Sequence, residues 1–128
     1  MARQQMILES QRAELLANWT RGLELARDDR EDEHDPRPVV KLFNPCGAAT
    51  WLLTELKPDE DGGEPDIAFG LCDLGHGSPE LGYVSLEELA SVKLMRGLLY
   101  IERDEHFTAT KTISEYTQAA RIARRIEA

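Results

Sequence analysis

Apolar residues near the start of the chain recur at three-to-four-residue steps. This spacing is typical of one buried stripe on a helix, and it predicts a helix over residues 6–27. Pro36 and Pro38 follow an acidic stretch and end the helix, because proline lacks the amide donor and restricts the residue before it. The stripe positions are Leu8, Leu15, Leu16, Trp19, Leu23 and Ala26.

Five runs rich in β-branched and apolar residues follow, separated by turn residues. They cover residues 39–43, 50–56, 67–73, 81–84 and 98–103. In the second run Trp51 and Leu53 are expected on one face, and Leu52 and Leu56 on the other. That run is therefore predicted to be an interior strand covered on both faces. Trp19 and Trp51 are interpreted as core anchors.

Two more helices complete the prediction. Ser85-Leu86-Glu87-Glu88 is a capping box. In this motif the serine hydroxyl accepts from the amide three residues on, and the Glu88 side chain reaches back to the start of the helix. The motif predicts a short helix that runs to about Lys93. Helical spacing returns from Thr112 or Ser114 to Ile126. Short links between successive strands predict an α+β fold, an antiparallel β-meander of about five strands with N- and C-terminal helices packed on it. The length of 128 residues fits a single domain, 1–128.

Charge excludes one class of function. The chain carries 24 acids, 15 Lys and Arg, and a formal net charge of -9. Such a chain repels phosphate, so direct nucleic-acid binding is not expected. The chain has no apolar stretch long enough for a membrane span and no secretory pattern at its start. Its two cysteines are not in a C-x-x-C arrangement. Together these features predict a cytoplasmic protein with reduced thiols.

The acids concentrate in two segments, 28–35 and 59–66, both expected in loops. One interpretation is that they keep a small domain soluble. The other is that they form an acidic surface for a basic protein partner. The residues expected to bind that partner are Asp28, Asp29, Glu31, Asp32, Glu33, Asp59, Glu60, Asp61 and Glu64.

Two groups of residues suggest chemistry. Glu102, Asp104 and His106 alternate, so in an extended segment they share a face and could hold a divalent metal. In the structural interpretation, Asp104 or His106 instead fixes a turn through backbone hydrogen bonds. Asp73, His76 and Glu80 surround a glycine-rich loop, where the glycines are equally explained by turns. Asp73 and Glu80 could join the first group in a composite acidic site.

Nucleophilic catalysis has little support in the sequence. Cys46 lies in a proline-glycine turn and could be exposed, whereas Cys72 lies in an apolar strand and is expected to pack there.

Several runs follow one another in a specific order: residues 35–43, 49–56, 68–75 and 79–85, and then Glu102-Arg103-Asp104 with His106-Phe107. Together they resemble a bacterial family of unassigned function, domain-of-unknown-function family 2958, over a match from about Leu8 through the final helix. The resemblance implies a small protein carried on plasmids and integrative conjugative elements, near genes for plasmid maintenance and antirestriction, with no established activity. The acidic insertion around 59–64 and His76, where relatives carry an apolar residue, depart from the pattern and weaken a catalytic role for His76.

The leading hypothesis is therefore a non-enzymatic accessory protein of mobile elements that needs no cofactor and binds a protein through its acidic surface. One version is interference with a host defence nuclease, with carboxylates in place of DNA phosphates. The alternative is a small metal-dependent hydrolase or nuclease with a carboxylate/His site. A third is an oligomerisation module, and the sequence leaves the oligomeric state open. The residues of the alternative site are Asp73, Glu80, Glu102, Asp104 and His106.

Overall fold

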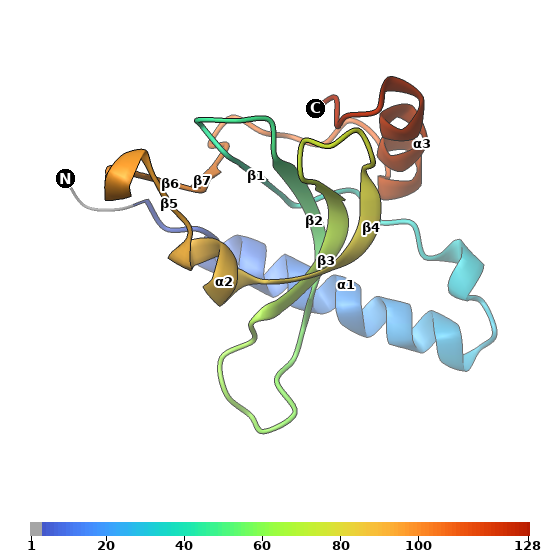
Figure 1. Cartoon of the computed structure of the whole chain (residues 1–128). Coiled ribbons are helices and arrows are strands. Elements are labelled where there is room, and N and C mark those ends of the chain that lie inside the picture. Colours follow the sequence, from blue (N-terminus) through green and yellow to red (C-terminus); the bar gives the residue numbers. More distant parts are fainter. Residues whose placement is uncertain (1–3) are drawn as a thin grey trace.

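The computed structural model describes residues 4–128 (Figure 1). Residues 1–3, part of the N-terminal sequence considered above, lie outside this range. The helices are α1 (Glu9–Arg27), α2 (Leu86–Ser91) and α3 (Ile113–Ala123), with short 3-10 turns η1 (Glu31–Glu33) and η2 (Met95–Gly97). The strands are β1 (Val40–Phe43), β2 (Thr50–Lys57), β3 (Ile67–Asp73), β4 (Glu80–Ser85), β5 (Lys93–Leu94), β6 (Leu99–Tyr100) and β7 (Glu102–Arg103).

The main sheet has five antiparallel strands in the order β4-β3-β2-β1-β7. The first four follow the chain as a meander, and β7 returns to the outer side of β1. Helices near both ends of the chain pack on this sheet (Figure 1). The predicted α+β fold is therefore confirmed. Among residues 4–128, no helix combines the length and apolar character that crossing a bilayer requires.

Strand β2 is covered on both faces, as predicted. Leu53 belongs to the hydrophobic cluster that contains Leu15 of α1, whereas its neighbour Leu52 belongs to the cluster formed with α3. Successive side chains of a strand point to opposite faces, so the two helices cover opposite sides of the sheet. Trp51 packs in the first cluster, which confirms it as a core anchor.

A β-bulge changes the register within β2. Leu53 pairs with Gly70 and Glu55 pairs with Phe69, so the intervening residue, Thr54, is extra. The extra residue reverses the alternation of side chains between the two faces of the sheet for the rest of β2. As a result Leu56 lies in the same cluster as Leu53, and its predicted placement beside Leu52 is wrong.

The buried face of α1 differs from the predicted stripe, and the helix begins at Glu9 rather than residue 6. Leu15 and Leu25 are buried, and Asn18 between them donates to the Thr54 carbonyl at 2.9 Å. The sheet-facing side thus includes a polar residue that a hydrophobic pattern does not count. Trp19 is only half-buried, so it is not the core anchor that we predicted. Three predicted stripe residues are exposed, Leu8, Leu23 and Ala26.

The predicted fifth strand, 98–103, is broken in two. β6 pairs with β5 in a separate two-stranded ladder, whereas β7 pairs with β1. Ile101, between them, is buried in the core while Leu98 is 78% exposed. The last two helices end earlier than predicted: α2 at Ser91, and α3 at Ala123, where Arg124 adopts a left-handed conformation with φ 63°.

Candidate protein-binding surface

The first acidic segment, residues 28–35, connects α1 to the chain leading into β1. The side chains of Asp28, Asp29, Glu31 and Asp32 are exposed, and within residues 4–128 none of them pairs with a cation. Glu33 is different, because both of its oxygens accept from Arg30, at 2.6 and 2.9 Å. This contact lowers the pKa of Glu33. The segment therefore presents four unneutralised carboxylates.

His34 fixes this segment to α1 and the sheet. Its Nε2 contacts the carboxylate of Glu55, a residue only 7% exposed, and the hydroxyl of Thr54 donates to the other Glu55 oxygen at 3.2 Å. On α1 the ring lies against Gly22, where an added Cβ would lie 2.9 Å from Nε2. Gly22 therefore provides the space in which the histidine packs.

Asp35 fixes the segment to α3. Its carboxylate accepts from the Ser114 amide at 2.9 Å and from the Ser114 hydroxyl at 2.5 Å, and the Pro36 carbonyl accepts from the Ile113 amide at 2.8 Å. Burial on its own would raise the pKa of Asp35, but the bonds from Ser114 and Thr112, together with the charge of His34, outweigh it and lower the pKa. Negative charge at a helix N-terminus is favourable.

This contact predicts a pH-dependent contribution to stability. Because the folded-state pKa of Asp35 is lowered, its ionised form stabilises the fold above the unfolded pKa, and this contribution is lost as pH falls through the folded pKa. We expect Asp35→Asn to lower the free energy of unfolding by about 1 kcal/mol at pH 7, as for other helix caps. The difference should shrink below about pH 4. Urea unfolding at pH 7 and pH 3 measures this difference in free energy between the variant and the native chain. The neighbouring Asp32→Asn is the control and should leave the free energy of unfolding unchanged at both pH values. If Asp35→Asn lowered it equally at pH 7 and pH 3, the stabilising role of the ionised Asp35 carboxylate would be contradicted.

The second acidic segment, residues 59–66, forms the loop between β2 and β3. Most of its carboxylates are engaged: Asp59 accepts from the Gly63 amide at 2.8 Å, Glu60 lies 3.9 Å from Lys57, and Glu64 lies 3.5 Å from Arg12. Asp66 binds the start of α2, accepting from the Ser85 hydroxyl at 2.6 Å and the Glu87 amide at 2.7 Å. Asp61 is exposed.

The contacts of Asp66 also revise the predicted capping box. Ser85 accepts from the Glu88 amide at 3.1 Å as expected. The Asp66 carboxylate adds a second cap from a distant part of the chain, because it accepts from the Ser85 hydroxyl and from the Glu87 amide.

The two acidic segments lie at opposite ends of α1. The base of the second contacts Arg12 in the first turns of the helix, and the first segment begins just after Arg27. Fifteen residues of the helix lie between Arg12 and Asp28, so the two residues are about 24 Å apart along the helix axis. In Figure 1 the β2–β3 loop projects below the sheet, whereas the first segment follows the far end of α1. The carboxylates thus form two separate patches rather than one surface.

Asp104 and His106 form a turn, in agreement with the structural interpretation of this group. The Asp104 carboxylate accepts from the His106 amide at 2.9 Å, and its other oxygen lies 3.4 Å from Lys41 Nζ. Glu102 and Asp104 line a surface hollow of about 460 Å³ next to Phe43. Within residues 4–128 no three His, Cys, Asp or Glu side chains are grouped so that they could hold a metal ion.

The composite site of the alternative hypothesis is not formed. Asp73 is 2% exposed, and its oxygens accept from the amides of Gly75, at 2.8 Å, and Ile126, at 3.0 Å. The pairing register places β2 and β1 between Asp73 and Glu102. Three interstrand steps separate the two backbones by about 14 Å. Glu80 is exposed at the start of β4, and His76 is exposed in the loop before it.

The cysteines behave as predicted from their surroundings. Cys46 is exposed and Cys72 is half-buried. Burial raises the pKa of the Cys72 thiol to about 11, so it is protonated at neutral pH. A protonated thiol is a poor nucleophile, which agrees with a packing role for Cys72.

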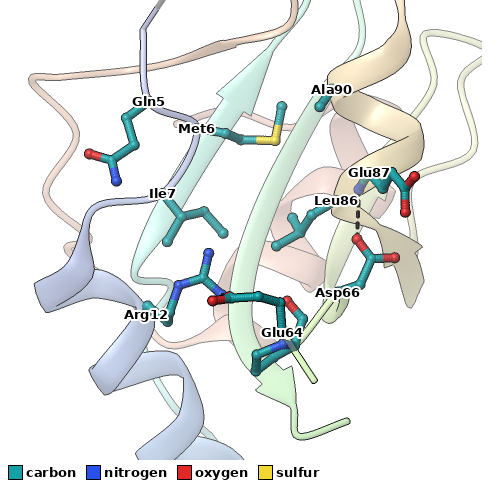
Figure 2. A pocket seen from close by; sticks show the side chains of 10 residues that line it. Gln5, Met6, Ile7, Arg12, Glu64, Asp66, Leu86, Glu87 and Ala90 are labelled. Atoms are coloured by element: carbon teal, nitrogen blue, oxygen red, sulfur yellow. Dashed lines mark hydrogen bonds and ion pairs between the residues drawn. The ribbon is translucent and has the colours of Figure 1, made fainter. Parts of the chain in front are cut away.

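A groove that the sequence did not predict lies between the N-terminal segment, α2 and the base of the second acidic segment (Figure 2). Its volume is about 350 Å³. Ile7 and Leu86 approach from opposite sides, and Arg12 and Glu64 lie together at one end. The predicted first helix, residues 6–27, includes Met6 and Ile7. They precede α1 instead, which leaves their side chains available to line the groove.

His34 was also missed as an anchoring residue, because a histidine within an acidic run resembles its solvated neighbours. The only sequence signal is its place directly before Asp35 and Pro36, where the chain leaves the acidic run.

A family model described as "Protein of unknown function (DUF2958)" matches residues 6–127. No curated protein and no solved structure matches the chain.

Proposed function

We propose that this chain, which belongs to the DUF2958 family of proteins of unknown function, is a non-enzymatic protein-binding module that holds a basic partner through its first acidic segment. One observation carries the proposal: the four unneutralised carboxylates are displayed on a backbone that is tied to α1, β2 and α3. Asp28, Asp29, Glu31 and Asp32 precede the His34 and Asp35 anchors directly.

Anchoring matters because binding costs conformational entropy. A solvated acidic loop must be ordered when it meets a partner, and each immobilised side chain or backbone residue weakens the complex. Here the contacts of His34 and Asp35 already supply much of that order in the free protein. This favours specific recognition over general solubility. Complementary charge would also accelerate association and make it sensitive to salt.

A protein that binds DNA offers the basic surface that this segment would fit. Our specific proposal is that the partner is a host defence nuclease and that the carboxylates occupy positions normally taken by DNA phosphates. The module would then act in the cytoplasm as an anti-defence accessory of a mobile element, with no cofactor. Arg12, which the base of the second acidic segment contacts, lies about 24 Å from Asp28 along α1, within the span of a standard protein interface, so one partner could contact both segments.

Affinity capture with matched baits tests this proposal. The patch variant carries Asp28→Asn, Asp29→Asn, Glu31→Gln and Asp32→Asn. Asn is well tolerated at residue 29, where the backbone φ is 55°. The control variant carries the same number of neutralisations at exposed sites elsewhere: Glu14→Gln, Glu24→Gln, Glu88→Gln and Glu127→Gln.

We expect the native chain and the control variant to retain a basic protein from bacterial lysate at about 50 mM salt and to release it at about 500 mM. The patch variant should not retain it. Calorimetry with the purified partner should then show binding at least about tenfold weaker for the patch variant than for the control. Equal retention by both variants would show that net charge, not this segment, attracts the partner, and would end the proposal.

A further inference from the structure

We infer that the groove of Figure 2 is a second contact site, which receives an apolar side chain of the partner flanked by arginine. This inference deepens the proposed function and rests on it, because it takes the partner to be a basic protein. The groove is lined by Met6, Ile7, Arg12, Glu64, Leu86 and Glu87, among others.

The lining of the groove indicates an apolar occupant. Ile7 and Leu86 line the groove although they are almost fully buried, and the half-buried Met6 lies beside them. A volume of about 350 Å³ accommodates one large aliphatic side chain and its flanking backbone. Methionine adapts its shape to different occupants more readily than branched side chains do.

The rim indicates the charge of the occupant. Three carboxylates, Glu64, Asp66 and Glu87, surround the apolar surface, against one cation, Arg12. Asp66 is engaged by α2, but Glu64 is 88% exposed and Glu87 is exposed as well. A basic flank is therefore favoured and an acidic one is excluded.

Arg12 shows what the rim can bind. Its Nη1 lies 3.4 Å from the Pro65 carbonyl and 3.5 Å from Glu64, and its Nε lies 3.9 Å from Glu9. These contacts surround the Arg12 guanidinium. All three distances are long for a hydrogen bond or an ion pair, so the contacts hold the guanidinium only weakly. An arginine from the partner could take the same acceptors and displace it. Arg12 thus competes with the ligand from within the chain.

The test is a titration of the ¹⁵N-labelled full chain with a capped hexapeptide of sequence Gly-Leu-Arg-Arg-Leu-Gly, followed by NMR. We expect shifts in the amides of Ile7, Leu86 and Glu87, with a dissociation constant on the order of millimolar. Replacing both leucines of the peptide by serine keeps its charge and should weaken binding at least about tenfold.

Two variants of the chain separate a binding groove from a structural ion pair. Glu64→Gln should weaken peptide binding about two- to fivefold, whereas Arg12→Gln should strengthen it by a similar factor because the internal competitor is gone. Amide spectra of the free variants establish that both are folded. If Arg12→Gln bound the peptide more weakly than the native chain does, Arg12 would not be a competitor of the peptide, and the proposed occupant of the groove would be wrong.

The outcomes also distinguish this inference from the proposed function. Peptide shifts confined to residues 28–33 would overturn the groove while leaving the first acidic segment as the binding surface. If the peptide shifted no amide of the chain, the groove would not be a binding site for it. The role of the first acidic segment would stand, because that role is tested separately by affinity capture with the matched baits. Groove shifts together with failed capture would support the groove and end the role of the first segment.

Discussion

Gly70→Ala is expected to unfold the protein or to lower its free energy of unfolding by more than about 4 kcal/mol. Gly70 lies in β3 opposite the bulge of β2, and a Cβ at this position would lie 1.9 Å from the Leu52 carbonyl oxygen and 2.8 Å from Leu53 Cα. Both atoms belong to the backbone of the central strand. They cannot move aside without breaking the pairing of β2 with β3, so the overlap costs most of the stability of an ordinary domain.

Gly82→Ala is the matched control, because Gly82 is the β4 partner of Gly70 and a Cβ there meets no atom within 4 Å. Its free energy of unfolding should stay within about 0.5 kcal/mol of the native value. Urea denaturation followed by tryptophan fluorescence reports both variants, since Trp51 is buried in the core. Similar midpoints for the two variants would show that β2 and β3 separate more easily than the structure implies.

Asp73→Ala is expected to lower the free energy of unfolding by about 2–4 kcal/mol. The carboxylate accepts from two backbone amides, those of Gly75 and Ile126, and its loss leaves both donors without this partner. Both bonds are only part-buried, so each loss costs an amount in the lower part of the range of about 1–3 kcal/mol. Chemical denaturation measures the total, and faster hydrogen exchange at the Ile126 amide locates part of it.

Glu80→Ala provides the comparison for Asp73, because the two residues belonged to the same hypothetical carboxylate site. Glu80 is exposed, and its removal should change stability by no more than about 0.5 kcal/mol. If Asp73→Ala were as stable as the native chain, the carboxylate would not hold the loop and the C-terminal segment together. Its burial would then require another explanation.

The sequence predicted the first four strands well because each is a short β-prone run bounded by turn residues. It did not predict how those strands lie against one another. The bulge at Thr54 depends on the close approach of Gly70, which is sixteen residues further along the chain and in another strand. The buried face of α1 depends on Asn18 and Gly22, whose roles come from a carbonyl and a histidine elsewhere in the fold.

The candidate site shows the same division. Charge counting identified both acidic segments, since clusters of carboxylates are visible in any sequence. It could not show that His34 and Asp35 fix the first segment, because Glu55 and Ser114 are distant in sequence. It also grouped Asp73 with Glu102 by residue type, whereas the pairing register inserts two strands between them. The groove was missed because its lining combines three separate parts of the chain.

The return of β7 to the side of β1 has a consequence for synthesis on the ribosome. Gln4 donates to the Arg103 carbonyl and accepts from the Arg103 amide, across a separation of 99 residues, and β1 pairs with β7. A growing chain can assemble β1 to β4 before Arg103 and the rest of β7 emerge from the ribosome. During that interval the outer edge of β1 is uncovered, and such edges recruit strands from other chains. Emergence and pairing of β7, rather than formation of the first hairpins, therefore end the exposure of this edge to aggregation.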